Sequence, residues 1–86
     1  MNKIGIIYNP NAGTGKIKKL LKIKEHLDLN HSVTIFDTKK PGDATEIARK
    51  ESGNFDIIVA AGGDGTINEV INGIQKDTVL GIIPLG

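Results

Sequence analysis

Three short apolar runs without polar alternation constrain the fold of this chain most strongly. They are Ile4 to Tyr8, Ile57 to Ala61 and Leu80 to Ile83. Runs of this kind are typical of strands that are buried on both faces, as in the parallel sheets of α/β proteins. A fourth run with more alternation, Ser32 to Asp37, predicts one further strand. The predicted sheet therefore needs helices on both of its faces.

Segments with helical periodicity separate the four predicted strands. Their apolar residues recur three and four positions apart, in the sets Ile17, Leu20, Leu21 and Leu27, then Ala44, Ile47 and Ala48, then Ile67, Val70, Ile71 and Ile74. The order β-α-β-α-β-α-β predicts a three-layer α/β/α fold with a mostly parallel sheet and right-handed crossovers. Capping-box spacing at Asp43 to Glu46 and at Thr66 to Glu69 predicts two of the helix starts.

Length and composition exclude several classes of protein. With 86 residues the chain holds one domain at most, and its net charge of +1 argues against a dedicated nucleic-acid binder. The absence of cysteine excludes a disulfide framework and a catalytic thiol, and it permits the cytoplasmic location that we expect. His26 and His31 have no partner spacing for a metal site, so we predict no metal ligands in this chain.

Two glycine-bearing turns follow predicted strands and lead into predicted helices. The first is Asn9 to Lys16, and the second is Gly62 to Thr66. Ligands of open α/β sheets bind beyond the carboxyl ends of the strands. Glycines there let backbone N–H groups approach a phosphate, and the helix N-terminus adds donors and a favourable dipole. The two turns therefore predict a shared phosphate site at one edge of the sheet.

Neither turn matches a standard phosphate-binding fingerprint. Pro10 occupies a position where a P-loop has glycine, and Ile17 occupies the position of its Ser or Thr. The dinucleotide pattern also fails, because Lys18 and Asn68 replace its third glycine. A plain strand-to-helix connection remains an alternative for the first turn. It explains the second turn less well, because three glycines surround one carboxylate there.

Asp64 has two interpretations. It could be the N-cap of the following helix, since aspartate is a preferred capping residue. It could instead be a carboxylate at the mouth of a phosphate site, where it orients a hydroxyl nucleophile or holds Mg²⁺ through water. We favour the second interpretation, because Thr66 and Glu69 are expected to cap the helix.

The first predicted helix carries a run of lysines without an intervening acid, from Lys16 to Lys24. These lysines could contact phosphate or an anionic membrane surface. We favour a solvated helix face, because most of them lie opposite the apolar stripe and Glu25 and Asp28 soon offset their charge.

Taken together, three segments resemble the catalytic domain of the diacylglycerol kinase family, which includes bacterial lipid kinases, sphingosine kinases and ceramide kinases. They are Asn9 to Gly13, Gly62 to Gly73 and the closing Ile82 to Gly86. The resemblance implies ATP-dependent phosphoryl transfer to a lipid hydroxyl with Mg²⁺. It also implies that residues 1–86 are the N-terminal, nucleotide-binding part of a two-domain catalytic unit. The family's β-rich second domain would follow this chain, so we expect a fragment that is inactive by itself.

The resemblance also implies site residues and partners. Asp64 matches the family's acidic residue, for which a catalytic or metal-linked role is implied. The implied partners are ATP and a diacylglycerol-like lipid, with peripheral membrane contact and a homodimer left open. The residues implied to line the nucleotide are Asn9, Pro10, Asn11, Ala12, Gly13, Thr38, Gly63, Asp64, Gly65, Thr66, Ile67, Asn68 and Glu69.

Two other readings remain open. NAD kinases share a Gly-Gly-Asp-Gly-Thr turn on a related fold, although Asn68-Glu69-Val70 and the Asn9-Pro10 turn look more like a lipid kinase. A nucleotide-binding module without catalysis is the second alternative. A receiver-type signalling module is disfavoured, because Tyr8-Asn9 offers no acidic cluster after the first strand.

Overall fold

Four strands, three α-helices and two short 3₁₀ turns make up the part of the chain that the structure describes. The computed structural model describes residues 1–12 and 16–85. The elements are β1 (Lys3–Tyr8), η1 (Pro10–Ala12), α1 (Lys16–Leu27), β2 (Ser32–Asp37), α2 (Asp43–Glu51), η2 (Ser52–Asn54), β3 (Ile57–Gly62), α3 (Asp64–Gly73) and β4 (Val79–Pro84). All four predicted strands and all three predicted helices are therefore confirmed.

The strands form one sheet in the order β2-β1-β3-β4, and every pair in it is parallel. The two inner strands, β1 and β3, are the buried ones, since Ile6, Ile7, Ile58 and Ala60 are each 0% exposed. Each inner strand packs against side chains on both faces of the sheet, and this explains why the sequences of these two strands are uninterrupted apolar runs.

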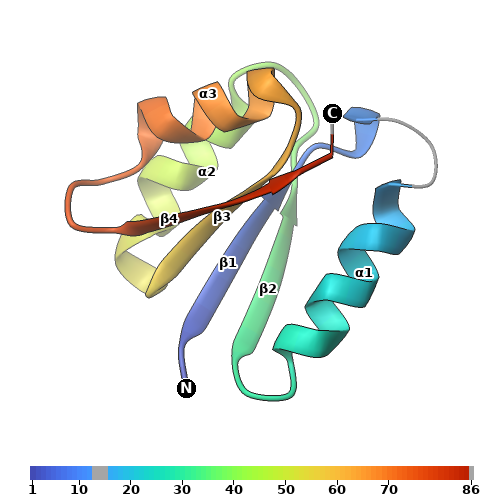
Figure 1. The fold of residues 1–86 in the computed structure, drawn as a ribbon. Helices are drawn as coiled ribbons and strands as arrows, with labels where there is room; N and C mark the ends of the chain where they lie inside the picture. Colours follow the sequence, from blue (N-terminus) through green and yellow to red (C-terminus); the bar gives the residue numbers. More distant parts are fainter. Residues whose placement is uncertain (13–15, 86) are drawn as a thin grey trace.

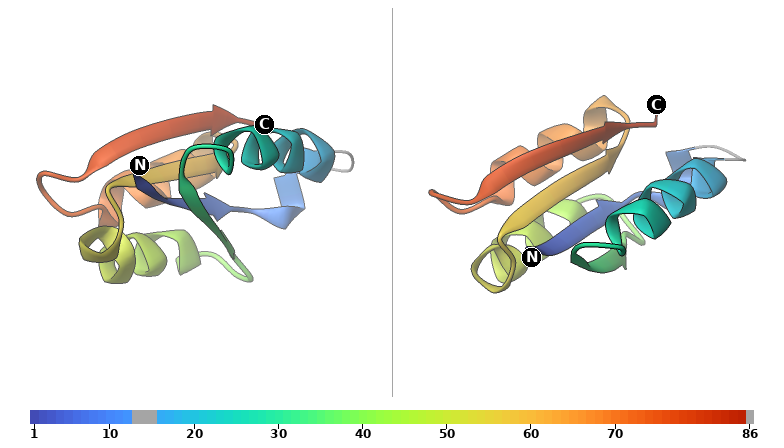
Figure 2. Two further views of the ribbon diagram at one scale, coloured as in Figure 1. Left: turned by 90° about the horizontal axis from the view of Figure 1, so that it is seen from below. Right: turned by 60° about the horizontal axis from the view of Figure 1, so that its bottom comes forward.

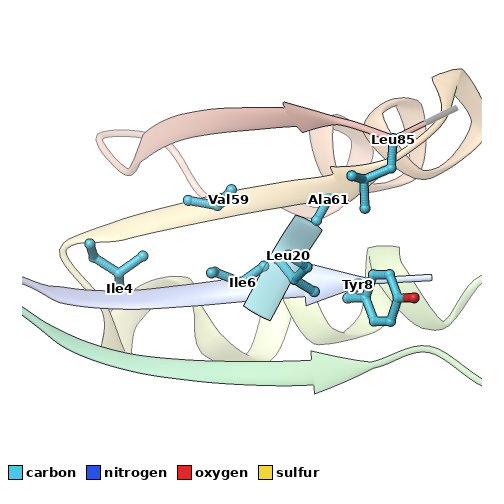
Figure 3. Packing of buried hydrophobic residues seen from close by; sticks show 7 residues of the cluster. All are labelled: Ile4, Ile6, Tyr8, Leu20, Val59, Ala61 and Leu85. Atoms are coloured by element: carbon cyan, nitrogen blue, oxygen red, sulfur yellow. The ribbon is translucent and has the colours of Figure 1, made fainter. Parts of the chain in front are cut away.

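Helices cover both faces of the sheet, as the three-layer prediction required (Figures 1 and 2). On one face, Leu20 of α1 packs with strand residues that include Ile6, Tyr8 and Val59 (Figure 3). On the other face, Ala44 and Ala48 of α2 and Val70 of α3 pack with Ile7, Ile58 and Ala60. The buried core is therefore divided between two layers on opposite sides of the sheet.

The apolar stripe predicted for α1 is broader than the one the helix buries. Leu20 is fully buried and Leu27 is half-buried, but Ile17 is 40% exposed and Leu21 is 50% exposed. A single helix covers this face among the described residues, so its contact with the sheet is narrow. None of the helices in residues 1–12 and 16–85 is long and apolar enough to cross a bilayer.

Both predicted capping boxes are wrong. Helix α3 begins at Asp64 with Gly63 as N-cap, so Thr66 and Glu69 lie inside the helix. Helix α2 begins at Asp43 with Gly42 as N-cap, and neither N-cap makes a side-chain hydrogen bond. Each helix starts at an acidic residue, whose charge is favoured by the dipole of the first turn. Gly42 turns the chain into α2 with a φ of 93°, a conformation that glycine adopts without a steric penalty.

Candidate functional site

The strand order places the two glycine-bearing turns at the topological switch point of the sheet. The chain leaves β1 towards β2 on one side and leaves β3 towards β4 on the other, while β1 and β3 are neighbours. Ligands of open α/β sheets bind in the crevice outside such carboxyl ends. The start of the first turn also contacts β3 close to its end, since the backbone N–H of Asn9 donates to the carbonyl of Ala61 at 3.3 Å. The described start of the first turn, Asn9 to Ala12, therefore lies at the same edge of the sheet as Gly62 to Thr66, as expected.

A cavity of about 180 Å³ opens at this edge. It is bounded by the turn after β1, the loop between β2 and α2, and the inner side of α3. Its lining residues are Asn9, Asn11, Thr38, Lys39, Lys40, Pro41, Ala44, Thr66 and Glu69. The structure therefore brings together Asn9, Asn11, Thr38, Thr66 and Glu69 from the set that the sequence pointed to.

Local hydrogen bonds fix the strand-end walls of this cavity. The Asn9 side-chain oxygen accepts a hydrogen bond from the backbone N–H of Asn11 at 2.9 Å, which folds the chain into η1. This Asx-type contact is a common way for asparagine to stabilise a turn. The backbone N–H of Thr38 donates to the carbonyl of Tyr8 at 2.9 Å, so the end of β2 stays on β1. Thr38 is 8% exposed, which places it on the cavity wall and away from bulk solvent.

The turn after β3 depends on glycine at position 62. A Cβ atom on Gly62 would lie 2.7 Å from Oγ1 of Thr66, closer than real side chains approach. Thr66 is thereby packed over the end of β3 and is 6% exposed. The carbonyl of Gly62 accepts from the backbone N–H of Leu85 at 2.9 Å, which ties the end of β4 to the same turn.

Asp64 lies outside the cavity. It is the first residue of α3, is exposed, and lines a separate hollow of about 210 Å³ with Gly62, Gly63, Ile67 and Pro84. Within residues 1–12 and 16–85 its carboxylate takes part in no hydrogen bond. The N-cap interpretation of Asp64 is wrong, because Gly63 occupies that position. The expected capping box is also absent, so it no longer argues for a functional role.

Several other residues that were predicted to line the nucleotide also do not line this cavity. Gly65, Ile67 and Asn68 line a shallow hollow of about 550 Å³ beside Asp64 and Ile71. Pro10 and Ala12 belong to η1, and Pro10 does not line the cavity. Gly13, predicted to line the nucleotide, lies outside the described residues together with Thr14 and Gly15.

The prediction missed four cavity residues, Lys39, Lys40, Pro41 and Ala44. A usable signal was present, because Lys39 and Lys40 follow a predicted strand and so had to lie at its carboxyl end. The two lysines outnumber Glu69 among the charged lining residues, so the cavity favours an anionic ligand. In the part of the chain that the structure describes, no group of three or more Asp, Glu or His side chains could hold a metal ion.

A family model described as the diacylglycerol kinase catalytic domain matches residues 3–86. A diacylglycerol kinase of Staphylococcus saprophyticus subsp. saprophyticus is 44% identical over 90 residues, which cover 94% of this chain and 28% of that protein. A diacylglycerol kinase of Staphylococcus aureus (strain bovine RF122 / ET3-1) is 41% identical over the same shares of the two chains.

A solved structure with a similar fold is the crystal structure of a diacylglycerol kinase from Bacillus anthracis str. Sterne. It superposes with a TM-score of 0.83 at 37% sequence identity, over 95% of this chain and 32% of that one. The chain thus spans less than a third of the length of the proteins that it matches.

Proposed function

This chain belongs to the diacylglycerol kinase catalytic domain family, and on that premise we propose that it is the N-terminal, nucleotide-binding part of an ATP-dependent lipid kinase. The observation that carries the proposal is the cavity at the switch point of β1 and β3. It is lined by residues of both predicted turns and by two lysines of the β2–α2 loop. A site of this kind suits a ligand with several negative charges and several hydrogen-bonding groups.

In this proposal, one part of ATP lies inside the cavity and the other part lies along the turn after β3. The cavity of about 180 Å³ is smaller than the roughly 300–1,000 Å³ of typical small-molecule sites. One end of the nucleotide would occupy the cavity, and the remainder would pass the N-terminus of α3, where no atom lies within 4 Å of a Cβ atom added at Gly65. The backbone N–H groups of a first helical turn are suited to bind phosphate.

Asp64 is proposed as the catalytic carboxylate. It lies at the first turn of α3, beside the path proposed for the phosphates, and it is exposed. It would accept a hydrogen bond from the acceptor hydroxyl, or face Mg²⁺ through water. Mg²⁺ would offset the charge on the phosphates. Because the described residues contain no metal-binding cluster, that ion would be held mainly by ATP, as is common for Mg²⁺.

The acceptor is proposed to be a diacylglycerol-like lipid. The matched relatives are named diacylglycerol kinases, which supports a lipid kinase over the NAD kinase alternative. An enzyme with such an acceptor would work at a membrane surface, and we propose the cytoplasmic side. The residues that select the lipid are expected in the part of the enzyme that this chain does not include.

The test is radiolabelled phosphate transfer from ATP to diacylglycerol in mixed micelles. The complete enzyme is represented by a chimaera in which this chain replaces the matching segment of the Staphylococcus saprophyticus enzyme. We expect the chimaera to phosphorylate diacylglycerol and the 86-residue chain alone to be inactive, because phosphoryl transfer depends on complete positioning of the reacting groups.

The parent enzyme is the positive control, and circular dichroism establishes that the chimaera is folded. A folded chimaera without activity would contradict the proposed function. Turnover by the 86-residue chain at a comparable rate would show instead that its site is complete.

A further inference from the structure

Glu69 connects α3 to the loop between β2 and α2. Its side-chain Oε1 accepts a hydrogen bond from the backbone N–H of Gly42 at 3.1 Å. Its backbone carbonyl accepts from Oγ1 of Thr45 at 2.7 Å. Both donors belong to the start of α2, which is 24 to 27 residues away in the sequence. A single residue of α3 thus holds two points at the N-terminal end of α2.

The loop that Glu69 holds carries the two cavity lysines. The carboxylate of Asp43 accepts from the backbone N–H groups of Lys39 at 2.8 Å and Lys40 at 3.1 Å. This contact folds the loop onto its own helix, but it does not fix the loop relative to α3. The Gly42 contact supplies that second attachment, next to the left-handed turn at Gly42. With both contacts present, Lys39 and Lys40 are held at the rim of the cavity.

The close packing of α2 and α3 favours a stable hydrogen bond between Gly42 and Glu69. The helices approach so closely that a Cβ atom on Gly73 would lie 2.1 Å from the carbonyl oxygen of Thr45. At the far end, the side chain of Gln75 donates to the carbonyl of Arg49 at 2.8 Å. Because the helices are packed this tightly, Oε1 of Glu69 is held within reach of the Gly42 N–H.

We propose that Glu69 is a positioning residue that holds the Lys39–Gly42 loop against the nucleotide cavity, and that it does so through the hydrogen bond from Gly42 to its Oε1 rather than through its charge. The inference rests on the proposed function, since it takes ATP as the ligand. It adds a structural task to the role that the family resemblance implied, in which Glu69 lines the nucleotide. It also predicts that loop position and ATP affinity depend on a hydrogen-bond acceptor at Oε1, whether or not the side chain is negatively charged.

Two substitutions separate these roles. Glu69→Gln keeps a side-chain oxygen that can accept from Gly42 and removes the charge. Glu69→Ala removes both. Glu46→Ala is the matched control, because Glu46 is a glutamate of α2 that pairs with Arg49 on the surface and does not line the cavity. All three variants are made in the 86-residue chain.

The first measurement is the Kd for ATP·Mg²⁺ by isothermal titration calorimetry. We expect Glu69→Ala to raise the Kd about tenfold, and Glu69→Gln and Glu46→Ala to stay within about threefold of wild type. The second measurement is hydrogen exchange of the Gly42 amide without nucleotide. It should become about tenfold faster in Glu69→Ala and remain slow in Glu69→Gln, because only the first variant opens the loop.

Two results would overturn the role of Glu69. One is a Glu69→Gln variant that loses as much affinity as Glu69→Ala, which would show that the charge itself contacts the ligand. The other is unchanged Gly42 exchange in a folded Glu69→Ala variant. A wild-type chain that fails to bind ATP would overturn the proposed function instead, so the two failures are distinguishable.

Discussion

The two faces of α3 differ in their burial and in the contacts that their side chains make. The face towards α2 and the sheet is buried, with Thr66 6% exposed and Val70 0% exposed, and it carries the contacts of Glu69. The opposite face is exposed and carries Asp64, Asn68 and Ile71, the last of which is 50% exposed. Residues 62–73 therefore form one continuous motif in the sequence and two separate surfaces in the fold.

This difference teaches how a glycine-rich motif can perform two tasks. The helical repeat of 3.6 residues per turn places residues three and four positions apart on one face. The inner face builds the cavity and attaches it to α2, while the outer face presents a carboxylate to the solvent. We propose that the first task is nucleotide binding and the second is catalysis, and substitutions on each face should have separable effects.

The largest expected effect is on the outer face, at Asp64. Asp64→Asn in the chimaera should lower the rate of lipid phosphorylation by about 10²–10⁴-fold, because the neutral amide keeps the shape and loses the charge. The Kd for ATP should stay within about threefold of wild type, since the Asp64 carboxylate is proposed to act on the lipid hydroxyl or on Mg²⁺. Steady-state kinetics beside direct nucleotide titration separates the two effects. A variant with near wild-type turnover would remove Asp64 from the catalytic role.

The next largest effect is expected on the free energy of unfolding, at Gly73 on the inner face of α3. Gly73→Ala should lower the free energy of unfolding by about 3 kcal/mol or more, because the added Cβ would meet the Thr45 carbonyl and push α2 from α3. Gly65→Ala is the matched control in the same helix, since no atom lies within 4 Å of its added Cβ. It should change stability by about 1 kcal/mol or less. Urea denaturation measures both, and equal losses would refute the close approach of the two helices.

The smallest effects come from two neighbours in the sequence on opposite faces. Val70→Ala should cost about 1.5–3 kcal/mol of unfolding free energy, since Val70 is fully buried between α3 and the sheet. Ile71→Gln should cost less than about 1 kcal/mol, because half of Ile71 is already exposed. Thermal denaturation of the two variants ranks them. A greater loss at Ile71 would show that the outer face of α3 is covered in solution.

The fold was predictable from local patterns, whereas the cavity was predictable only in part. Uninterrupted apolar runs specify buried strands, and these determine which residues follow at the carboxyl edge. Helix starts were misplaced, because Asp43 and Asp64 begin their helices without the side-chain caps that the spacing suggested. Lys39 and Lys40 belong to no recognised motif. We propose that their place in the cavity is held by the hydrogen bond between Gly42 and Glu69, which are 27 residues apart.

The most direct test of the account is an NMR titration of the 86-residue chain with ATP·Mg²⁺. The account predicts saturable amide shifts that are largest at the carboxyl edge of the sheet, at Asn9, Asn11, Thr38 to Lys40 and Thr66. It predicts little change at His31, Asp56 and Thr78, which precede strands at the opposite edge. Shifts concentrated at that opposite edge, or no saturable shift, would contradict the assignment of the cavity as the nucleotide site.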